Sequence, residues 1–192
     1  MIGLEWGAIR VVPYCGEWPR LYEEEAKHVR QAIGERIRDI QHFGSTAVPG
    51  MCAKPIIDIA VAVDSLNAAQ ICIKQLEKIG YKHLWASDQP RSDFFIKGNP
   101  TEYHLRIFEA GSPDWARHIG FRDLLRRDSR VASDYAKLKK DLSKRFKNSR
   151  EAYQDGKTDF VQNILDHAGT EQAALARSSP REKWMDACGF WG

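Results

Sequence analysis

The sequence predicts an α/β fold (α+β), in which a mixed β-sheet flanked by helices is followed by a C-terminal helical subdomain. Three observations support this prediction. Period-two alternation and short apolar runs occur up to residue 108, whereas helical periodicity dominates after Gly111. The third observation is the stretch HFGSTAVPGMCAKPIIDIAVAV at residues 42–63, in which a Gly-Ser pair and a loop lead into a continuous apolar run.

The first half of the chain contains all the predicted strands. A helical stripe of apolar residues over 18–33 ends at Gly34, and a second helix over 65–79 ends at Gly80. A Gly-Asn-Pro turn at residues 98–100 separates two strand-like segments, which predicts a hairpin. The predicted strands are residues 8–12, 37–43, 56–63, 81–85, 94–97 and 101–108.

The second half is predicted to be helical. The motif Ser112-Pro113-Asp114 favours a helix start, and two further helices are expected over 131–146 and 151–167. We therefore expect one domain over residues 1–168, with a sheet-containing part at 8–108 and a helical part at 112–168. Residues 169–192 are predicted to form a tail, in which a small, polar linker precedes an apolar terminus.

The composition is compatible with one soluble domain and does not point to a particular class of partner. The chain of 192 residues carries 29 basic and 26 acidic residues, so nothing demands a nucleic-acid partner. Basic residues concentrate at 122–130 and 137–147, which on helices is typical of a solvated face. The four cysteines have neither metal-ligand nor disulfide spacing, and no membrane span or signal sequence is visible, so we expect a cytoplasmic protein.

The Gly44-Ser45 pair and Asp58 are the features of residues 42–63 that suggest chemistry. A Gly-Ser corner lets backbone N–H groups approach an anion, with the Ser hydroxyl as a further donor. A lone carboxylate in an apolar strand is the kind of group that binds Mg²⁺ or transfers a proton. The alternative is an ordinary turn followed by an aspartate at a strand edge. Together, the two features favour a phosphate-and-metal site.

The order of these residues resembles the signature of the GrpB family, His-φ-Gly-Ser-Thr-Ala-Val-Pro-Gly followed by Lys-Pro-Ile-φ-Asp. The resemblance covers residues 8–168 in six elements that occur in order. It implies a fold of the nucleotidyltransferase superfamily, the group related to polymerase beta. The flanking elements are Val12-Pro13-Tyr14 with Glu17-Trp18-Pro19, Tyr103-His104-Leu105-Arg106, residues 121–126, residues 135–139, and Tyr153 with Lys157 and Phe160.

The resemblance also implies a metal-binding arrangement that this sequence carries only in part. In that superfamily the strand after the corner bears two carboxylates at alternate positions, which hold Mg²⁺ against a nucleoside triphosphate. Here Asp58 is alone, because its same-face neighbours Ile56 and Ala60 cannot bind a metal. Glu102, on a later strand, is the candidate replacement, although a solvent-facing strand position is an equally natural interpretation. His104 lies on the same predicted strand face as Glu102.

These considerations define a candidate site. Gly44, Ser45 and Thr46 would hold a phosphate, and Asp58 would bind one Mg²⁺ or orient a cation. Asp58, His104 and Glu102 are the candidate catalytic groups. Positive charge would come from Lys54, Arg106 and Arg122, although Lys54 could equally be a surface charge. His42 is interpreted as a structural imidazole.

Three functions are consistent with these residues. The first is binding of a nucleotide or another phosphorylated small molecule without turnover, which the incomplete set of carboxylates favours. The second is Mg²⁺-dependent nucleotidyl transfer. The third is an accessory role in coenzyme A metabolism, suggested by the fusion of some members of the resembled family to dephospho-coenzyme A kinase.

Overall fold

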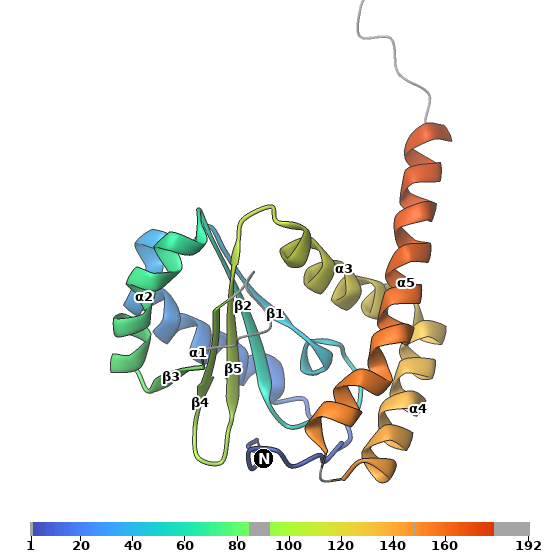
Figure 1. Ribbon diagram of the computed structural model, residues 1–192, viewed down its shortest axis with the longest axis horizontal. Coiled ribbons are helices and arrows are strands. Elements are labelled where there is room, and N and C mark those ends of the chain that lie inside the picture. Colours follow the sequence, from blue (N-terminus) through green and yellow to red (C-terminus); the bar gives the residue numbers. More distant parts are fainter. Residues whose placement is uncertain (1, 85–92, 148, 179–192) are drawn as a thin grey trace, which may run out of the picture.

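Five strands form one mixed sheet in the order β1-β2-β5-β4-β3 (Figure 1). The computed structural model describes residues 2–84, 93–147 and 149–178, with only the backbone for residues 68, 69 and 167–178. β2 pairs parallel with β5, and the other neighbours pair antiparallel, including the predicted β4–β5 hairpin. The strands are β1 (Asp39–Phe43), β2 (Ile57–Val63), β3 (Tyr81–Leu84), β4 (Asp93–Lys97) and β5 (Tyr103–Glu109).

The central strand β2 has two faces of different character. Its odd-numbered residues, from Ile57 to Val63, are fully buried in the main apolar core. Because successive side chains of a strand point to opposite faces, Asp58 and Ala60 lie on the other face. The parallel neighbour β5 follows the same alternation, with Leu105 in the main core and His104 paired in register with Asp58. The alternation therefore brings the polar residues of two strands to one side of the sheet.

Two helices cover the apolar face of the sheet (Figure 1). They are α1 (Trp18–Ile33) and α2 (Leu66–Lys78), close to the helices predicted at 18–33 and 65–79. α1 begins with Trp18-Pro19, and proline is well tolerated in the first turn of a helix because the N–H it lacks has no partner there. Trp18 and Val29 are completely buried against the sheet, so this layer forms the largest part of the core.

The helical half packs beside the opposite face of the sheet (Figure 1). It comprises α3 (Pro113–Arg127), α4 (Ser129–Arg145) and α5 (Arg150–Ser178). The Ser112 hydroxyl accepts a hydrogen bond from the Trp115 N–H, which confirms the predicted helix start. An apolar cluster of Leu125 and Tyr135 with Val48 and Met51 attaches these helices to the loop after the Gly-Ser corner. This attachment sets the helical half against the Asp58 side of the sheet.

Two predictions about the ends of the chain need correction. Residues 8–12 do not form a strand, because only Val12 makes a bridge, to Ala53, and Pro13 lacks the N–H that would continue it. The last helix does not end near residue 167, since α5 continues to Ser178. The predicted tail beyond that residue lies outside the described residues. No helix in the described part of the chain is long and apolar enough to cross a membrane.

Candidate anion-binding site

The Gly44-Ser45 corner is built around the side chain of Asp58. Gly44 has φ +69° and ψ −171°, a backbone conformation open essentially only to glycine. A Cβ added to Gly44 would lie 2.4 Å from Asp58 Oδ2, so glycine is also needed for space. A short 3₁₀ turn, Ser45–Ala47, follows. The corner therefore sits directly on the carboxylate that β2 presents.

Asp58 and His104 form a hydrogen-bonded pair across β2 and β5. His104 Nδ1 lies 3.0 Å from Asp58 Oδ1, and the Asp58 side chain is 28% exposed. Burial alone would raise the pKa of the Asp58 carboxyl, but the hydrogen bond with His104 and the charges of His104 and Lys54 lower it overall. Asp58 is therefore a carboxylate at neutral pH, and it faces mainly basic groups.

The first group of basic side chains comes from α4. Lys139 is 2% exposed, and its Nζ donates to Ser45 Oγ at 2.8 Å and to the Cys52 carbonyl. The same ammonium lies 4.8 Å from the centre of the Tyr135 ring. Burial lowers the pKa of Lys139 to about 8, although the charge of Asp58 opposes the shift. Lys139 therefore places positive charge at the corner itself.

The second group comes from the start of α5. Lys157 Nζ and Lys54 Nζ lie 4.5 Å and 5.7 Å from the centre of the Tyr153 ring, so both ammonium groups surround one aromatic side chain. Burial, with the positive charges of Lys54 and Lys139, lowers the pKa of Lys157 to about 7. Burial also lowers the pKa of Lys54 and of Arg150, while Asp58 opposes both shifts. Within the described residues, Lys157 has no carboxylate at ion-pair distance.

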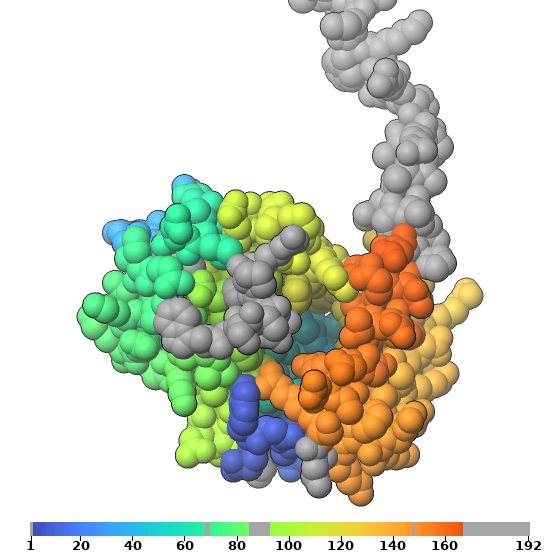
Figure 2. Space-filling view, viewed as in Figure 1, coloured from blue at the N-terminus to red at the C-terminus, as the bar shows by residue number. Residues whose placement is uncertain are grey.

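These groups line one cavity of about 1080 Å³ between the sheet and the helical half. Figure 2 shows it as a recess with the blue N-terminal segment and the orange α5 at its border. Seven lysine or arginine residues line the cavity, against three acidic residues. The basic residues are Lys54, Arg106, Arg117, Arg122, Lys139, Arg150 and Lys157, and the acidic ones are Asp58, Glu151 and Asp155. The excess of positive charge makes the cavity suited to an anion.

Several predicted site residues line this cavity, but some have structural partners. Gly44, Ser45, Lys54, Asp58 and His104 are brought together as expected from the sequence. Thr46 is buried, and its hydroxyl is hydrogen-bonded to His42 Nε2 at 3.0 Å, while the His42 ring stacks on Tyr22. Burial lowers the pKa of His42 to about 4, so this imidazole is neutral. The interpretation of His42 as structural agrees with these contacts.

The two predicted arginines differ in their surroundings. The Arg122 guanidinium is buried and donates to Gln41, to the His42 carbonyl and to Asp123, so its donors tie α3 to β1. Arg106 projects from β5 with its guanidinium 4.8 Å from the centre of the Phe94 ring, and it lines the cavity. Both arginines line the cavity.

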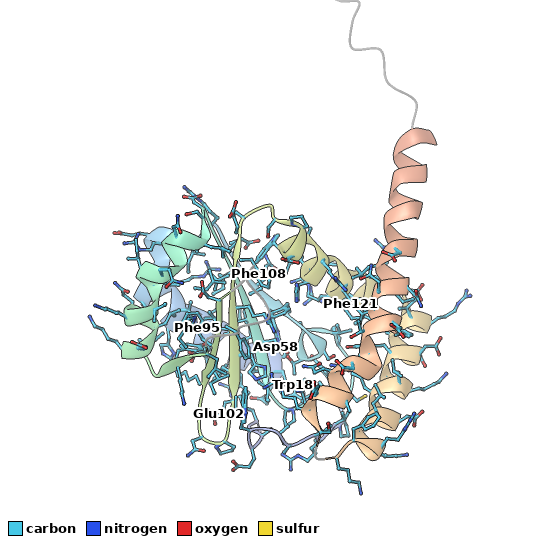
Figure 3. All side chains as sticks on the ribbon, viewed as in Figure 1. Trp18, Asp58, Phe95, Glu102, Phe108 and Phe121 are labelled. Carbon is cyan, nitrogen blue, oxygen red and sulfur yellow. The ribbon has the colours of Figure 1, made fainter. Side chains whose placement is uncertain are left out.

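Glu102 does not complete a carboxylate pair with Asp58. It precedes β5, and its N–H donates to the Lys97 carbonyl to close the β4–β5 hairpin. Figure 3 places Glu102 near the hairpin end of the sheet, away from Asp58, and it does not line the cavity. The expectation that Glu102 lies on the later strand is corrected, because the residue belongs to the turn before β5, and there it does not supply the second carboxylate beside Asp58.

The lysines of α4 and α5 are not among the site residues predicted from the sequence. The basic residues around Lys139 were expected to form a solvated helix face, which holds for Lys137, paired with exposed Asp134. A usable signal was present, since Tyr135 and Lys139 share an i, i+4 spacing with Tyr153 and Lys157. Residues four apart lie on one helix face. The tyrosines are buried, so the lysines beside them point inward as well.

The residues around Asp58 do not fit a two-metal centre. Clamping two Mg²⁺ ions requires several carboxylates. The neighbours of Asp58 at alternate positions are Ile56, just before β2, and Ala60, and its partner on β5 is His104. One Asp58 oxygen is already hydrogen-bonded to His104, and ammonium groups occupy the surroundings. Among the described residues, no group of three His, Cys, Asp or Glu side chains could hold a metal ion.

The arrangement of the sheet and its helices matches a known fold. The fold is similar to that of Cid1 poly(U) polymerase with Mg 3′-dATP bound, with a TM-score of 0.52 at 12% identity over 76% of this chain and 49% of that chain. The fold is therefore nucleotidyltransferase-like, as the resemblance to the GrpB family implied. At this low identity the likeness concerns the fold alone.

Closer relatives place the chain in a family. Residues 8–167 match the model described as GrpB protein, so the chain belongs to the GrpB family. It is 37% identical to the glutamate-rich protein GrpB of Alkalihalophilus pseudofirmus, over 86% of this chain and 98% of that protein. The crystal structure of conserved protein GrpB from Enterococcus faecalis has a TM-score of 0.78 at 30% identity, over 85% of this chain and 99% of that chain.

A further likeness covers part of a longer protein. The chain is 28% identical to a dephospho-CoA kinase of Mycolicibacterium paratuberculosis, over 76% of this chain and 42% of that protein.

Proposed function

We propose that this protein binds a nucleotide or another phosphorylated small molecule in the cavity between the sheet and the helical half, without a divalent cation. The observation that carries the proposal is the position of Lys139 and Lys157. Both ammonium groups enter the cavity from helices, and Lys139 reaches the hydroxyl of Ser45. A phosphate between Ser45 and these lysines would gain charge-assisted hydrogen bonds, which are stronger than those between neutral groups.

Binding without turnover agrees with the donor groups around Asp58. Displacement at phosphorus by a two-metal mechanism needs metal ions on both the attacking and the leaving oxygen, and Asp58 alone cannot hold them. The Asp58–His104 pair would instead stabilise the corner and orient the imidazole toward a bound ligand. Mg²⁺-dependent nucleotidyl transfer is the competing function, and it predicts radiolabelled nucleotide transfer that is lost in Asp58→Asn.

A second candidate is an accessory role in coenzyme A metabolism. The likeness to part of a dephospho-CoA kinase supports it. Coenzyme A precursors are phosphorylated, so the same basic cavity would receive them. This candidate differs from general nucleotide binding in its ligand preference, and a ligand panel separates the two.

Isothermal titration calorimetry tests the proposal. The ligands are inorganic pyrophosphate, ATP, UTP and dephospho-coenzyme A, each measured in EDTA and in excess Mg²⁺. The variants are Lys139→Gln and the matched control Lys137→Gln, which removes the same charge from the exposed side of α4. We expect at least one ligand to bind in EDTA, and Lys139→Gln to weaken it about 10- to 100-fold, the order of a hydrogen bond to a charged group.

Two results would contradict the proposal. One is the absence of binding to every ligand in EDTA together with binding in Mg²⁺, which would require a metal site. The other is equal weakening by Lys139→Gln and Lys137→Gln, which would indicate a general effect of protein charge. Circular dichroism of both variants checks that the overall helix content is retained.

A further inference from the structure

Trp6 occupies an unusual position at the border of the cavity. It is 55% exposed, yet it lines the same cavity as Lys139 and Lys157. Trp6 stands in a tight turn, in which the Ala8 N–H donates to the Glu5 carbonyl and Gly7 has φ +87°. A type II turn requires a positive φ at its third residue, which glycine supplies without strain. Trp6 is therefore the second residue of the turn, and its indole remains exposed at the border of the cavity.

The segment that carries Trp6 is fixed on both sides of the turn. Before it, the Gly3 N–H donates to the Pro55 carbonyl, and Leu4 pairs with Thr101. After it, Ile9 is buried, and its N–H donates to the Lys147 carbonyl. These bonds hold the turn between the sheet and the start of α5. An exposed tryptophan on an anchored turn loses little conformational freedom when a ligand packs on it.

Arg150 orients the indole toward the basic side of the cavity. Its guanidinium carbon lies 4.3 Å from the centre of the Trp6 ring, a cation–π distance. Arg150, Tyr153 and Lys157 follow one another at i, i+3 and i+7 on α5, so they share a helix face. At 1.5 Å per residue, Arg150 and Lys157 are about 10 Å apart along the helix. The Trp6 indole, next to Arg150, and the Lys157 ammonium group thus lie near the two ends of this helix face.

We infer that Trp6 is a stacking platform that selects phosphorylated ligands carrying a planar heteroaromatic ring. The inference rests on the proposed function, because the phosphate groups of the ligand would lie at Lys157 and Lys139. The ring would then reach the border of the cavity and stack on the indole. A nucleoside di- or triphosphate has this arrangement, with the base and the terminal phosphates at opposite ends. Ligands without a ring would use the lysines alone.

The test compares ATP with inorganic tripolyphosphate in EDTA, using wild type, Trp6→Ala and Trp6→Phe. Stacking of one base on an aromatic side chain contributes about a tenfold gain in affinity. We expect Trp6→Ala to weaken ATP about tenfold and to leave tripolyphosphate unchanged. Trp6→Phe should retain most of the ATP affinity, because phenylalanine keeps a ring at the turn. Thermal unfolding of each variant confirms that the fold is intact.

Failures of the two proposals give different results. Two results would overturn the role of Trp6 alone, provided that wild type binds tripolyphosphate. In the first, wild type binds ATP no more tightly than tripolyphosphate. In the second, Trp6→Ala binds ATP as tightly as wild type does. Equal weakening of ATP and tripolyphosphate in Trp6→Ala would also overturn it, since the effect would then concern the phosphates. Failure of wild type to bind either ligand would overturn the proposed function and this inference together.

Discussion

The two walls of the cavity differ in how their polar groups are satisfied. On the sheet side, Asp58 is bonded to His104, and His42 is bonded to Thr46. On the helical side, Lys139 bonds only uncharged oxygens, and Lys157 has no carboxylate at ion-pair distance among the described residues. Burial lowers the pKa of both lysines, which means that their protonated form is less stable in the folded protein than in water. The sheet supplies a fixed corner, and the helices supply charge that a ligand would satisfy.

This difference indicates a division of roles. Groups that satisfy one another stabilise a shape, whereas buried charges without counter-ions favour an incoming anion. Changes to the lysines of the helical side should therefore act on ligand affinity, and changes to the corner on the sheet side should act on the folded structure. Asp58 is the exception on the sheet side, because its charge faces the basic groups. The following predictions test this comparison, beginning with the largest expected effect.

The double variant Lys139→Gln/Lys157→Gln should lose most of the affinity for pyrophosphate. Each lysine would contribute a charged hydrogen bond of about 1.5–3 kcal/mol, so the combined loss is about 3–6 kcal/mol. Removal of two buried charges should leave the free energy of unfolding unchanged or higher. Calorimetry and urea unfolding measure the two quantities. A stable variant with wild-type affinity would remove both lysines from the site.

Gly44→Ala should destabilise the protein by about 2–4 kcal/mol. Alanine is strained at this backbone conformation, and its Cβ would collide with Asp58. Gly34→Ala is the matched control, because Gly34 has an ordinary helical φ of −54° and no atom near an added Cβ. Thermal unfolding of both variants measures the difference. Equal midpoints for Gly44→Ala and Gly34→Ala would show that the corner does not depend on glycine.

Affinity for sulfate should fall about tenfold or more between about pH 6 and pH 9, because lysines lose their charge above their pKa. The relevant pKa values are about 7 for Lys157 and about 8 for Lys139. Sulfate keeps a constant charge over this range, so the change reports the protein. Lys157→Arg should flatten the profile, since arginine stays protonated. A flat wild-type profile would contradict the lowered pKa values.

The same pKa shifts fix the sign of the pH dependence of stability. Above about pH 7 the folded protein releases the Lys157 proton, while the unfolded chain keeps it up to about pH 10.5. The unfolded state then binds more protons, so the contribution of Lys157 to the free energy of unfolding rises with pH across this window. Urea unfolding of wild type and Lys157→Gln at several pH values, without anions, measures this contribution. If the free energy of unfolding depends on pH equally in both proteins, the lowered pKa of Lys157 is contradicted.

Asp58→Asn should strengthen pyrophosphate binding in EDTA by about three- to tenfold. Asparagine keeps the shape of the side chain and removes the negative charge that faces the basic groups. Affinity in Mg²⁺ should match affinity in EDTA for both proteins, apart from the chelation of pyrophosphate by the metal. Weaker binding by Asp58→Asn in Mg²⁺ alone would instead identify a metal ligand.

Glu102→Gln should change ligand affinity by less than about twofold, because a half-buried charge outside the cavity has no contact with a ligand and its long-range effect is screened by salt. Glu102 belongs to the β4–β5 turn, where its N–H donates to the Lys97 carbonyl. The same calorimetric titration with pyrophosphate serves here. A loss comparable to that of Lys139→Gln would bring Glu102 back into the site.

Much of the fold could be predicted because its signals are local. The helix over 18–33 has the predicted bounds, and the strand with Asp58 begins one residue later than expected. The corner residues are close in sequence to Asp58, so a single stretch contained several residues of the candidate site. By contrast, the start of β5 decides whether Glu102 belongs to a strand face or to a turn, and alternation cannot place that boundary within one residue.

The lysines could not be located in the same way. Lys139 lies 94 residues after Ser45, and their contact depends on how α4 packs against the loop after the corner. The position of α5 depends on a close approach at Gly156, where an added Cβ would lie 2.5 Å from Leu142 Cδ2. Periodicity identifies the faces of these helices, but only their packing decides which face meets the cavity.

A crystal structure of the protein grown in EDTA and soaked with tungstate, a heavy analogue of phosphate, tests the central claim most directly. The anomalous signal of tungsten locates the anion independently of the surrounding density. We expect a peak within hydrogen-bond distance of Ser45 Oγ, Lys139 Nζ and Lys157 Nζ, and its loss in the Lys139→Gln/Lys157→Gln variant. Tungstate bound only on the outer surface, or in the cavity only when Mg²⁺ is present beside Asp58, would contradict the account.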